Sequence, residues 1–442
     1  MKNKCKKLSF LLVLLLLAGS LSPFAAAGES TYVYPPVTGL TSDDTLGNEH
    51  APITQDLISM VNHNAQLKAL LTESIARAAQ INPDRKTNPA QTLAEYYDFI
   101  DWASKAMPWN LLDLSDCRLY EQIDQSLDYF YFLNDQPLEA LSGKGYYNNS
   151  IQYVEPYRSW MIHYTTQWGQ YLNTTASWNE AAYQLALADE RFSLGKGIYE
   201  DPSNWTTFNQ FFARHLKSPD MRPIDALVDD SVVVSPADSK PQGVWQIDEN
   251  SLIIADGGVD IKSNYFASVE VLLGESVYKS AFAGGTLTHT FLDVNDYHRY
   301  HFPVSGIIKE VFVIPADDAA GGITIWDAEK GKYMLQAQQF GWQNIETRGC
   351  VIIETLDYGL VAVLPIGMSQ VSSVNFEDTV QVGTQVKKGD MLGCFLFGGS
   401  DIVMLFQKGA DFKLTAPQLE DGSYDHINMG NAYGVLKSTL TQ

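Results

Sequence analysis

The sequence predicts an α+β fold, with a helical N-terminal region followed by a β-rich region. From Pro52 to about Leu194, apolar residues recur three and four positions apart, which is the spacing of amphipathic helices. After Trp205 the pattern changes to short β-branched and apolar runs separated by Gly, Asp and Asn. A chain of 442 residues is long enough to bury a large core and to contain two substructures of this kind.

The first residues have the composition of an export signal. Four lysines within residues 2–7 precede an unbroken apolar stretch at 10–18, and residues 25–27 are three alanines. We expect residues 1–27 to be a secretory signal peptide, so that the mature protein is periplasmic or extracellular. An uncleaved anchor is the minor alternative, because the run is shorter than the about 20 residues that a membrane span needs. Residues 28–50, which contain Pro and Gly but few apolar residues in series, predict a linker.

The chain is strongly acidic, with 30 Lys and Arg against 52 Asp and Glu and a net charge of −22. Loss of residues 1–27 removes four lysines and no acid, so the net charge of the mature chain falls to −26. This balance argues against a nucleic-acid partner and, on average, against anionic bilayers, while peripheral membrane contact through a local basic patch stays open. Cys117, Cys350 and Cys394 remain after export, which allows at most one internal disulfide. The sequence contains no cluster of Cys and His residues that would predict a metal site.

The predicted helical region covers residues 51–200. Apolar residues three and four apart within 53–61 and within 67–75 predict two amphipathic helices. Farther along, six aromatic residues follow one another in steps of three and four, which places them on one helical face: Tyr153, Tyr157, Trp160, Tyr164, Trp168 and Tyr171. We interpret this stripe as core packing, with a substrate-lining surface as the alternative.

Six runs in the second region predict β-strands, because they are short, apolar and bounded by turn residues. They are residues 232–234, 269–273, 311–314, 351–354, 360–365 and 402–406. Residues 379–395 resemble the turn-and-strand pattern of lipoyl-type β-sandwiches, although Lys387 and Lys388 do not occupy a carrier position. The Gly284-Gly285 pair predicts a turn, since the further glycines of a phosphate-binding loop are missing.

The tripeptide Gly398-Gly399-Ser400 lies between an apolar run and a predicted strand. At a strained turn, a serine hydroxyl can attack the preceding glycine carbonyl to form an ester. Elimination then breaks the chain and leaves a pyruvoyl group where Ser400 had been. The alternative is an ordinary β-turn, which such a tripeptide also favours.

Two further segments carry residue types suited to proton transfer. His298 and His301 are three residues apart, so they could share one face of a helical turn or lie close together on a loop. Structural histidines and a metal pair are the alternatives. Asp238 ends a β-branched run, where it could orient a histidine as the third member of an Asp-His-Ser relay or simply cap a turn.

Five stretches together resemble the phosphatidylserine decarboxylase family, both in their amino-acid sequences and in their order along the chain. They are residues 205–214 with 222–225, 235–238, 296–301, 348–349 with 359–367, and 398–400. The resemblance covers roughly the last 240 residues, and several motifs in fixed order make chance similarity improbable. It implies a catalytic domain over residues 205–442, cleaved by itself between 399 and 400 into two chains that stay associated.

The resemblance also implies roles for four residues. Ser400 matches the serine that becomes the pyruvoyl cofactor, while His301 and Asp238 match the partners that activate it for cleavage. His298 matches the histidine placed against the pyruvoyl group, which accepts the electrons released when the substrate carboxylate leaves as carbon dioxide. A histidine titrating near neutrality would suit the protonation that follows.

Two residues depart from the family pattern. Ser239 stands where Gly usually follows the Asp, and Asp401 stands where Ser or Thr usually follows the cleavage serine. Both residues are next to reacting groups, so the efficiency of self-cleavage is not determined by the resemblance.

The expected activity is the decarboxylation of an amine-bearing α-carboxylate, with phosphatidylserine converted to phosphatidylethanolamine as the first expectation. The N-terminal region is loosely similar to the extension of soluble L-tryptophan decarboxylases that branch from the same family. A free aromatic L-amino acid such as tryptophan is therefore the alternative substrate. A non-catalytic exported binding protein of the same fold is a third possibility, which Ser239 and Asp401 permit and the retained Asp238, His298, His301 and Ser400 oppose.

Overall fold

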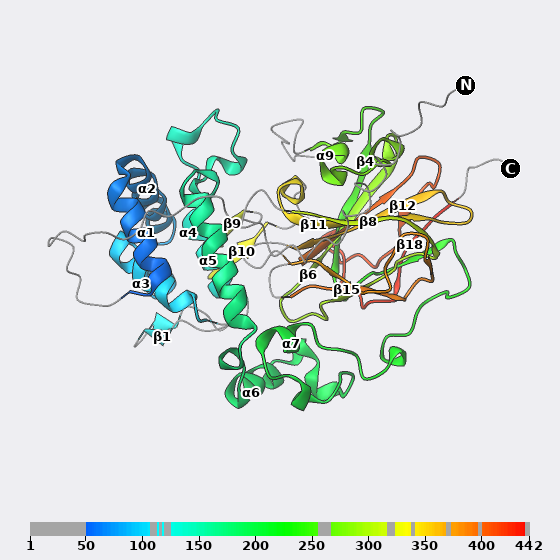
Figure 1. Ribbon diagram of the computed structural model, residues 1–442, viewed down its shortest axis with the longest axis horizontal. Helices are drawn as coiled ribbons and strands as arrows, with labels where there is room; N and C mark the ends of the chain where they lie inside the picture. The colour runs from blue at the N-terminus through cyan, green and yellow to red at the C-terminus, as the bar shows by residue number, and fades with distance from the viewer. Residues whose placement is uncertain are drawn as a thin grey trace, which may run out of the picture.

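The computed structural model has the predicted α+β architecture, with helices on one side and antiparallel sheets on the other (Figure 1). It describes residues 50–106, 113–114, 117–118, 125–254, 267–315, 323–336, 341–367, 373–396 and 400–437, without the side chains of 113–127. The predicted signal peptide, nearly all of the predicted linker, and Gly398 and Gly399 lie outside the described residues.

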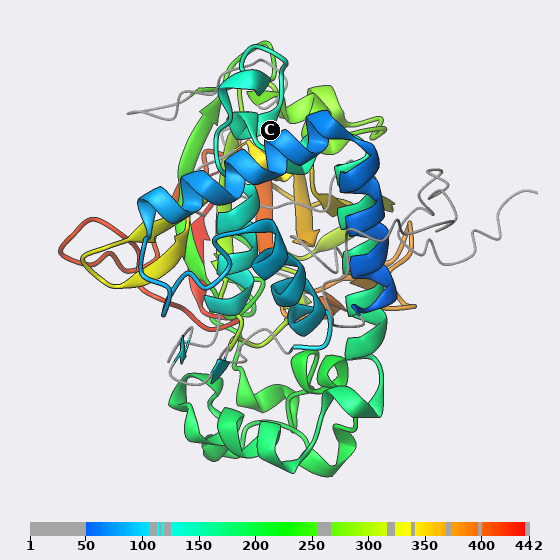
Figure 2. The same cartoon turned by 90° about the vertical axis from the view of Figure 1, so that its left-hand side faces the viewer.

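The N-terminal region is helical, as predicted. Asn64 and Thr92 begin two of its helices, and each side chain accepts a hydrogen bond from a backbone N–H three residues later. Figure 2 shows these helices in front of the β-rich region. The helices are α1 (Pro52–His63), α2 (Ala65–Ile81), α3 (Leu93–Ala103), α4 (Gln125–Asn134), α5 (Tyr157–Leu172) and α6 (Glu180–Ala188), with the short α7 (Phe208–Phe212) following.

The aromatic stripe packs into the core, as we interpreted it. Within α5, Trp160 stacks between Tyr157 and Tyr164, with ring centroids 5.3 and 5.4 Å apart, and all three are fully buried. Tyr153 precedes the helix in a short turn, η3 (Ile151–Tyr153), and Tyr171 is half-buried near its end. These side chains therefore contribute to burial rather than to a substrate-lining surface.

An eight-stranded antiparallel sheet dominates the second region, in the order β14-β8-β11-β12-β16-β6-β4-β5. Two three-stranded sheets, β13-β15-β7 and β17-β18-β3, and two hairpins, β1-β2 and β9-β10, accompany it. The strands are β1 (Asp113–Leu114), β2 (Cys117–Arg118), β3 (Val232–Val234), β4 (Lys240–Ile247), β5 (Ile253–Ile254), β6 (Thr286–Leu292), β7 (Arg299–His301), β8 (Gly306–Ile314), β9 (Thr324–Asp327), β10 (Lys332–Leu335), β11 (Thr347–Glu354), β12 (Leu360–Gly367), β13 (Asn375–Phe376), β14 (Gln385–Val386), β15 (Met391–Cys394), β16 (Ser400–Phe406), β17 (Lys413–Leu414) and β18 (Ala432–Val435).

Five of the six predicted strands are confirmed, and one prediction is wrong. Residues 269–273 form the helix α9 (Val269–Leu273), which buries Val269, Leu272 and Leu273 at helical spacing. The Ser268 side chain caps it by accepting from the backbone N–H of Val271. The cap and the buried face thus outweigh the β-propensity of the run. Residues 379–395 supply β14 and β15 to two different sheets.

The two faces of the large sheet bury two separate cores. Along β16, Ile402, Met404 and Phe406 join one core, while Val403 and Leu405 join the other. The first core continues into the N-terminal helices, so the helical and β-rich regions are packed together. Among the helices of the described residues, none combines the length and apolarity needed to cross a membrane.

Candidate active site

Two stretches of chain that run antiparallel bring the predicted reacting residues together. Ser400 begins β16 opposite Leu292, the last residue of β6. Six residues after Leu292, the carbonyl of His298 accepts a hydrogen bond of 2.9 Å from the backbone N–H of Phe395. β7, which ends in His301, then pairs with β15. The segment that leads into Ser400 therefore lies alongside the segment that carries both histidines.

Ser400 is fully buried and faces the first core. Side chains alternate along a strand, so Ser400 shares its face of β16 with Ile402, whereas Asp401 points to the opposite face. The bond expected to be cleaved precedes Ser400, and Gly399 is outside the described residues. Nearby, Gly393 of β15 is required by packing, because a Cβ there would lie 2.0 Å from the carbonyl oxygen of Asn375 and 2.7 Å from the Tyr300 ring.

His298 is a buried, neutral imidazole. Its Nδ1 donates to the carbonyl of Asp296 at 2.9 Å, and its ring stacks on Phe212 with centroids 3.8 Å apart. Burial, with the nearby charge of Arg214, holds the pKa of His298 well below its usual value. Its Nε2 is buried and makes no hydrogen bond to any described residue. The expectation of a histidine titrating near neutrality is therefore wrong here, and Nε2 is instead a proton acceptor.

His301 is also buried and neutral. Its Nδ1 donates to the carbonyl of Gly389 at 2.8 Å, and the hydroxyl of Tyr297 lies 3.3 Å from Nε2. Burial lowers the pKa of His301 to about 4, although the carbonyl of Gly389 and the charge of Asp238 raise it in part. The histidine pair lies on a loop and the adjoining strand β7, so the helical-turn alternative is wrong.

Asp238 contacts Arg222 rather than a histidine. The Arg222 guanidinium donates to both carboxylate oxygens, and the backbone N–H of Met429 donates to Oδ1 at 2.8 Å. Among the hydrogen bonds of the described residues, none joins Asp238 to His301. Asp238 acts on His301 through its charge, so the direct Asp–His contact of a relay is not formed in this structure.

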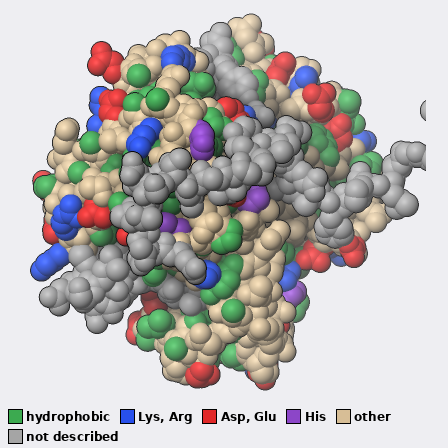
Figure 3. Space-filling model, turned by 60° about the vertical axis from the view of Figure 1, so that its left-hand side comes forward, with side chains coloured by type: hydrophobic (Ala, Val, Ile, Leu, Met, Phe, Trp, Pro, Cys, Tyr) green, Lys and Arg blue, Asp and Glu red, His purple; other side chains and the backbone are tan. Residues whose placement is uncertain are grey.

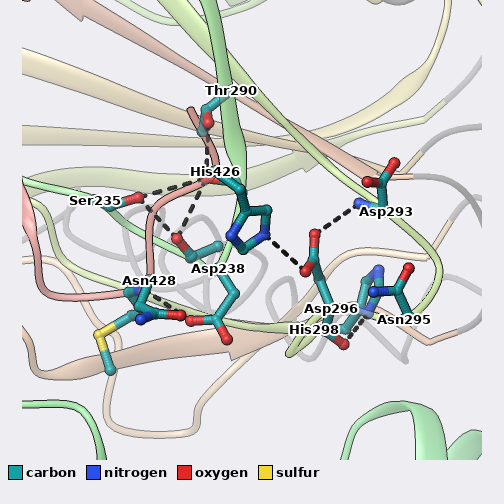
Figure 4. A network of polar contacts seen from close by, with 12 residues as sticks. Ser235, Asp238, Thr290, Asp293, Asn295, Asp296, His298, His426 and Asn428 are labelled. Carbon is teal, nitrogen blue, oxygen red and sulfur yellow. Dashed lines mark hydrogen bonds and ion pairs between the residues drawn. The ribbon is translucent and has the colours of Figure 1, made fainter. Parts of the chain in front are cut away.

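Asp296 links the buried histidine to the surface. Its carboxylate accepts from the Nε2 of His426 at 2.8 Å and from the backbone N–H of Asp293, while its carbonyl accepts from His298 (Figure 4). The same carbonyl accepts from Arg214. Burial opposes the charge on His426, but the hydrogen bond and charge of Asp296 outweigh it and raise the pKa of His426 to about 9.

Sequence reasoning assigned no role to Asp296, Arg222, Arg214 or His426. The first three lie within the stretches that resemble the family, which is a signal that could have found them. His426 follows an unremarkable Asp in the C-terminal segment, and only the folded chain brings it to Asp296, 130 residues away in sequence.

Both departures from the family pattern are accommodated by residues of β6. Ser239 accepts a hydrogen bond from Thr290 at 2.7 Å and donates to the carbonyl of Ala237 at 3.2 Å. The carboxylate of Asp401 lies 2.9 Å from Nδ1 of His289 on the neighbouring strand β6 and accepts from Gln343 at 3.1 Å. Each unusual side chain is thus buried with hydrogen-bond partners, as buried polar groups require.

A metal site is not evident in the part of the chain that the structure describes, because no three His, Cys, Asp or Glu side chains converge suitably. Cys350 and Cys394 are both free thiols. Burial raises the pKa of Cys350 to about 12, which makes it unreactive near neutrality.

A known protein family matches the region of the chain that carries these residues. Residues 208–435 match the family model described as phosphatidylserine decarboxylase. The β-rich region is therefore that of a carboxy-lyase. More narrowly, the chain belongs to the phosphatidylserine decarboxylase family.

Several curated proteins are similar to the chain. Phosphatidylserine decarboxylase proenzyme 2 of Oryza sativa subsp. japonica is 33% identical over 248 residues, which cover 55% of this chain and 36% of the rice protein. Phosphatidylserine decarboxylase proenzyme of Haemophilus ducreyi is 30% identical over 226 residues, covering 48% of this chain and 71% of that protein. Decarboxylase iboD of Amanita muscaria is 29% identical over 278 residues, covering 57% and 76%.

Proposed function

We propose that this chain is a pyruvoyl-dependent decarboxylase that cleaves itself between Gly399 and Ser400 and converts phosphatidylserine to phosphatidylethanolamine. The observation that carries the proposal is the antiparallel arrangement, which pairs Ser400 with Leu292 in the sheet and joins Phe395 to His298 by a backbone hydrogen bond. The relatives named proenzymes support a processing step. We also propose that the protein is exported, because residues 2–27 have the composition of a secretory signal.

Processing needs a base for the Ser400 hydroxyl. As its Oγ bonds to the carbonyl carbon of Gly399, the hydroxyl proton must move to an acceptor. A neutral His301 can take it at Nε2, because Nδ1 already donates to Gly389 and fixes the tautomer. The negative charge of Asp238 stabilises the imidazolium that forms.

The residues around Ser400 fit a pyruvoyl group. Such a group supplies an electron sink for loss of the carboxylate. The unpartnered Nε2 of His298 can take the proton that a substrate ammonium must lose before it reacts. His298 can then return this proton to the carbon that lost its carboxylate, which completes the product. His298 therefore acts first as an acceptor and then as a donor.

The register also explains how the cleaved chains would stay associated. All seven residues of β16 pair with β6 and with β12, both of which precede the cleavage site. β18 in the C-terminal segment pairs in turn with β3. A break before Ser400 leaves these ladders intact, so we expect a non-covalent pair of chains.

A free amino acid is the second candidate substrate. It is favoured by the similarity to decarboxylase iboD, whose name contains no lipid and of which 76% is covered. The aromatic stripe does not favour it, because those side chains are buried in the helical core. A non-catalytic binding protein is less well supported, since Ser239 and Asp401 both have buried partners that preserve the site.

Two measurements test the proposal. Intact mass under denaturing conditions is expected to show two chains that part between 399 and 400, with a pyruvoyl group at the new N-terminus, and a single chain for Ser400→Ala. Processed protein is then expected to release carbon dioxide from phosphatidylserine micelles. An uncut parent chain would refute self-processing, and activity on tryptophan alone would reverse the order of the substrates.

A further inference from the structure

A cavity of about 360 Å³ lies between the helical region and the catalytic region. Four residues within 190–196 line it from two short turns, η5 (Glu190–Phe192) and η6 (Leu194–Lys196). The family match begins only at residue 208. Asp238 and Asp296 contribute to the other wall. One wall of the cavity therefore comes from residues that precede the family match, where this chain can differ from its relatives.

The lining is polar and balanced in charge. Tyr199 is the one aromatic residue among the described lining residues, and no aliphatic side chain takes part. With His426 protonated, four acidic and four basic side chains contribute: Glu190, Asp238, Asp293 and Asp296, and Arg191, Lys196, Arg222 and His426. The whole chain carries −22, so this cavity is a local exception in which an anion can be held. On the face shown in Figure 3, acidic and basic side chains are likewise interspersed.

Two of the four basic side chains, Lys196 and His426, have a nitrogen that makes no hydrogen bond to any described residue. Arg222 is bound to both oxygens of Asp238, and Arg191 is paired with Asp189. In contrast, the side-chain ammonium of Lys196 makes no hydrogen bond or ion pair with any described residue, and only its backbone N–H is bonded, to the carbonyl of Ser193. His426 uses Nε2 on Asp296, and its Nδ1 makes no hydrogen bond within the described chain.

We propose that Lys196 and His426 bind the phosphodiester of a phosphoserine-type head group, so that the segment 190–196 determines substrate specificity. This inference rests on the proposed decarboxylase function. A phosphodiester offers two non-bridging oxygens, which share one negative charge, to two cationic donors, and this gives strong charge-assisted hydrogen bonds. An aromatic substrate side chain would find Tyr199 as its one aromatic contact among the described lining residues.

The position of the cavity fits a head group that reacts at Ser400. Asp293, which lines the cavity, directly follows Leu292, the strand partner of Ser400. Asp238, whose charge acts on His301, lines the same space. A head group held by Lys196 and His426 would therefore lie beside the cleavage site.

Binding to the full-length Ser400→Ala protein tests the proposal without turnover. Calorimetry with glycerophosphoserine, the water-soluble head group, is expected to show binding that becomes about tenfold weaker in Lys196→Met, since an exposed charged hydrogen bond is lost. Lys217→Met, which changes another exposed lysine that does not line the cavity, is the matched control and is expected to bind like its parent.

Three outcomes would overturn the proposal. They are equal binding by Lys196→Met and its parent, absence of glycerophosphoserine binding, and inorganic phosphate binding as tightly as glycerophosphoserine, which would indicate a site for free phosphate. Carbon dioxide release from phosphatidylserine by the processed parent protein is measured separately. Its presence together with any of these outcomes would refute the subsite and leave the proposed function intact, whereas its absence would refute the function itself.

Discussion

His426 Nε2 lies 2.8 Å from Oδ1 of Asp296, and the same Asp296 accepts the Nδ1 proton of His298 through its carbonyl. One residue thus connects a charged imidazole in a cavity to a neutral imidazole buried beside the segment that leads into β16. The carboxylate fixes the first ring and the backbone fixes the second, so the two histidines have different charges only two hydrogen bonds apart.

The His426–Asp296 pair predicts a specific pH dependence of stability. Because the folded-state pKa of His426, about 9, is above its ordinary value of 6.5, the pair stabilises fully below about pH 6.5 and loses its effect as the pH rises through about 9. We expect His426→Gln to lower the free energy of unfolding of the Ser400→Ala protein by about 1–2 kcal/mol at pH 6, allowing for solvent screening. Urea titrations from pH 6 to 10 measure this.

The groups that face His426 are Asp296, Asp238 and Asp293, with Arg222 close by, and they are unchanged in this variant. His63→Gln, at an exposed position on α1, is the control. A difference between His426→Gln and its parent that stayed constant up to pH 10 would contradict an ionic contribution.

His298→Ala is expected to undergo cleavage but to decarboxylate about 10²–10⁴-fold more slowly than the parent, because the acceptor at Nε2 is removed. Intact mass measures processing, and carbon dioxide release measures turnover. His63→Ala serves as the control. A processed His298→Ala protein with the parental rate would show that another group moves the proton.

Asp238→Asn is expected to slow self-cleavage at neutral pH by about tenfold or more. Asn keeps the shape and can still accept from the Met429 backbone, but it removes the charge that helps His301 to accept a proton. The fraction cleaved is followed by mass spectrometry after synthesis in vitro. Asp220→Asn, at an exposed position, should cleave like the parent. Parental cleavage by Asp238→Asn would remove Asp238 from the processing step.

Asp401→Ser, which introduces a residue usual for the family, is expected to destabilise this chain by about 1–3 kcal/mol, because it leaves Nδ1 of the buried His289 without its carboxylate partner. Urea unfolding of the Ser400→Ala protein measures the loss. The double change with His289→Gln should cost less than the sum of the two single changes. Strict additivity would mean that Asp401 and His289 do not stabilise each other.

Much of the architecture could be predicted from periodicity. Helical spacing predicted α1, α2 and the buried stripe of α5, and β-branched runs predicted β3, β11, β12 and β16. The strand prediction for residues 269–273 was wrong, because this run with β-branched residues also has a buried helical face. The Ser268 cap, which lies outside the run, stabilises the helix. Short apolar runs are ambiguous for this reason.

The sequence by itself determined the order of the motifs, and with it the family and the four residues assigned to the chemistry. Only the tertiary structure decided how these residues are charged and which groups they contact. Burial makes His298 and His301 neutral, Arg222 rather than a histidine holds Asp238, and β6 supplies partners for Ser239 and Asp401. The charge and partners of a side chain depend on desolvation and on residues far away in sequence, which the fold alone brings into contact.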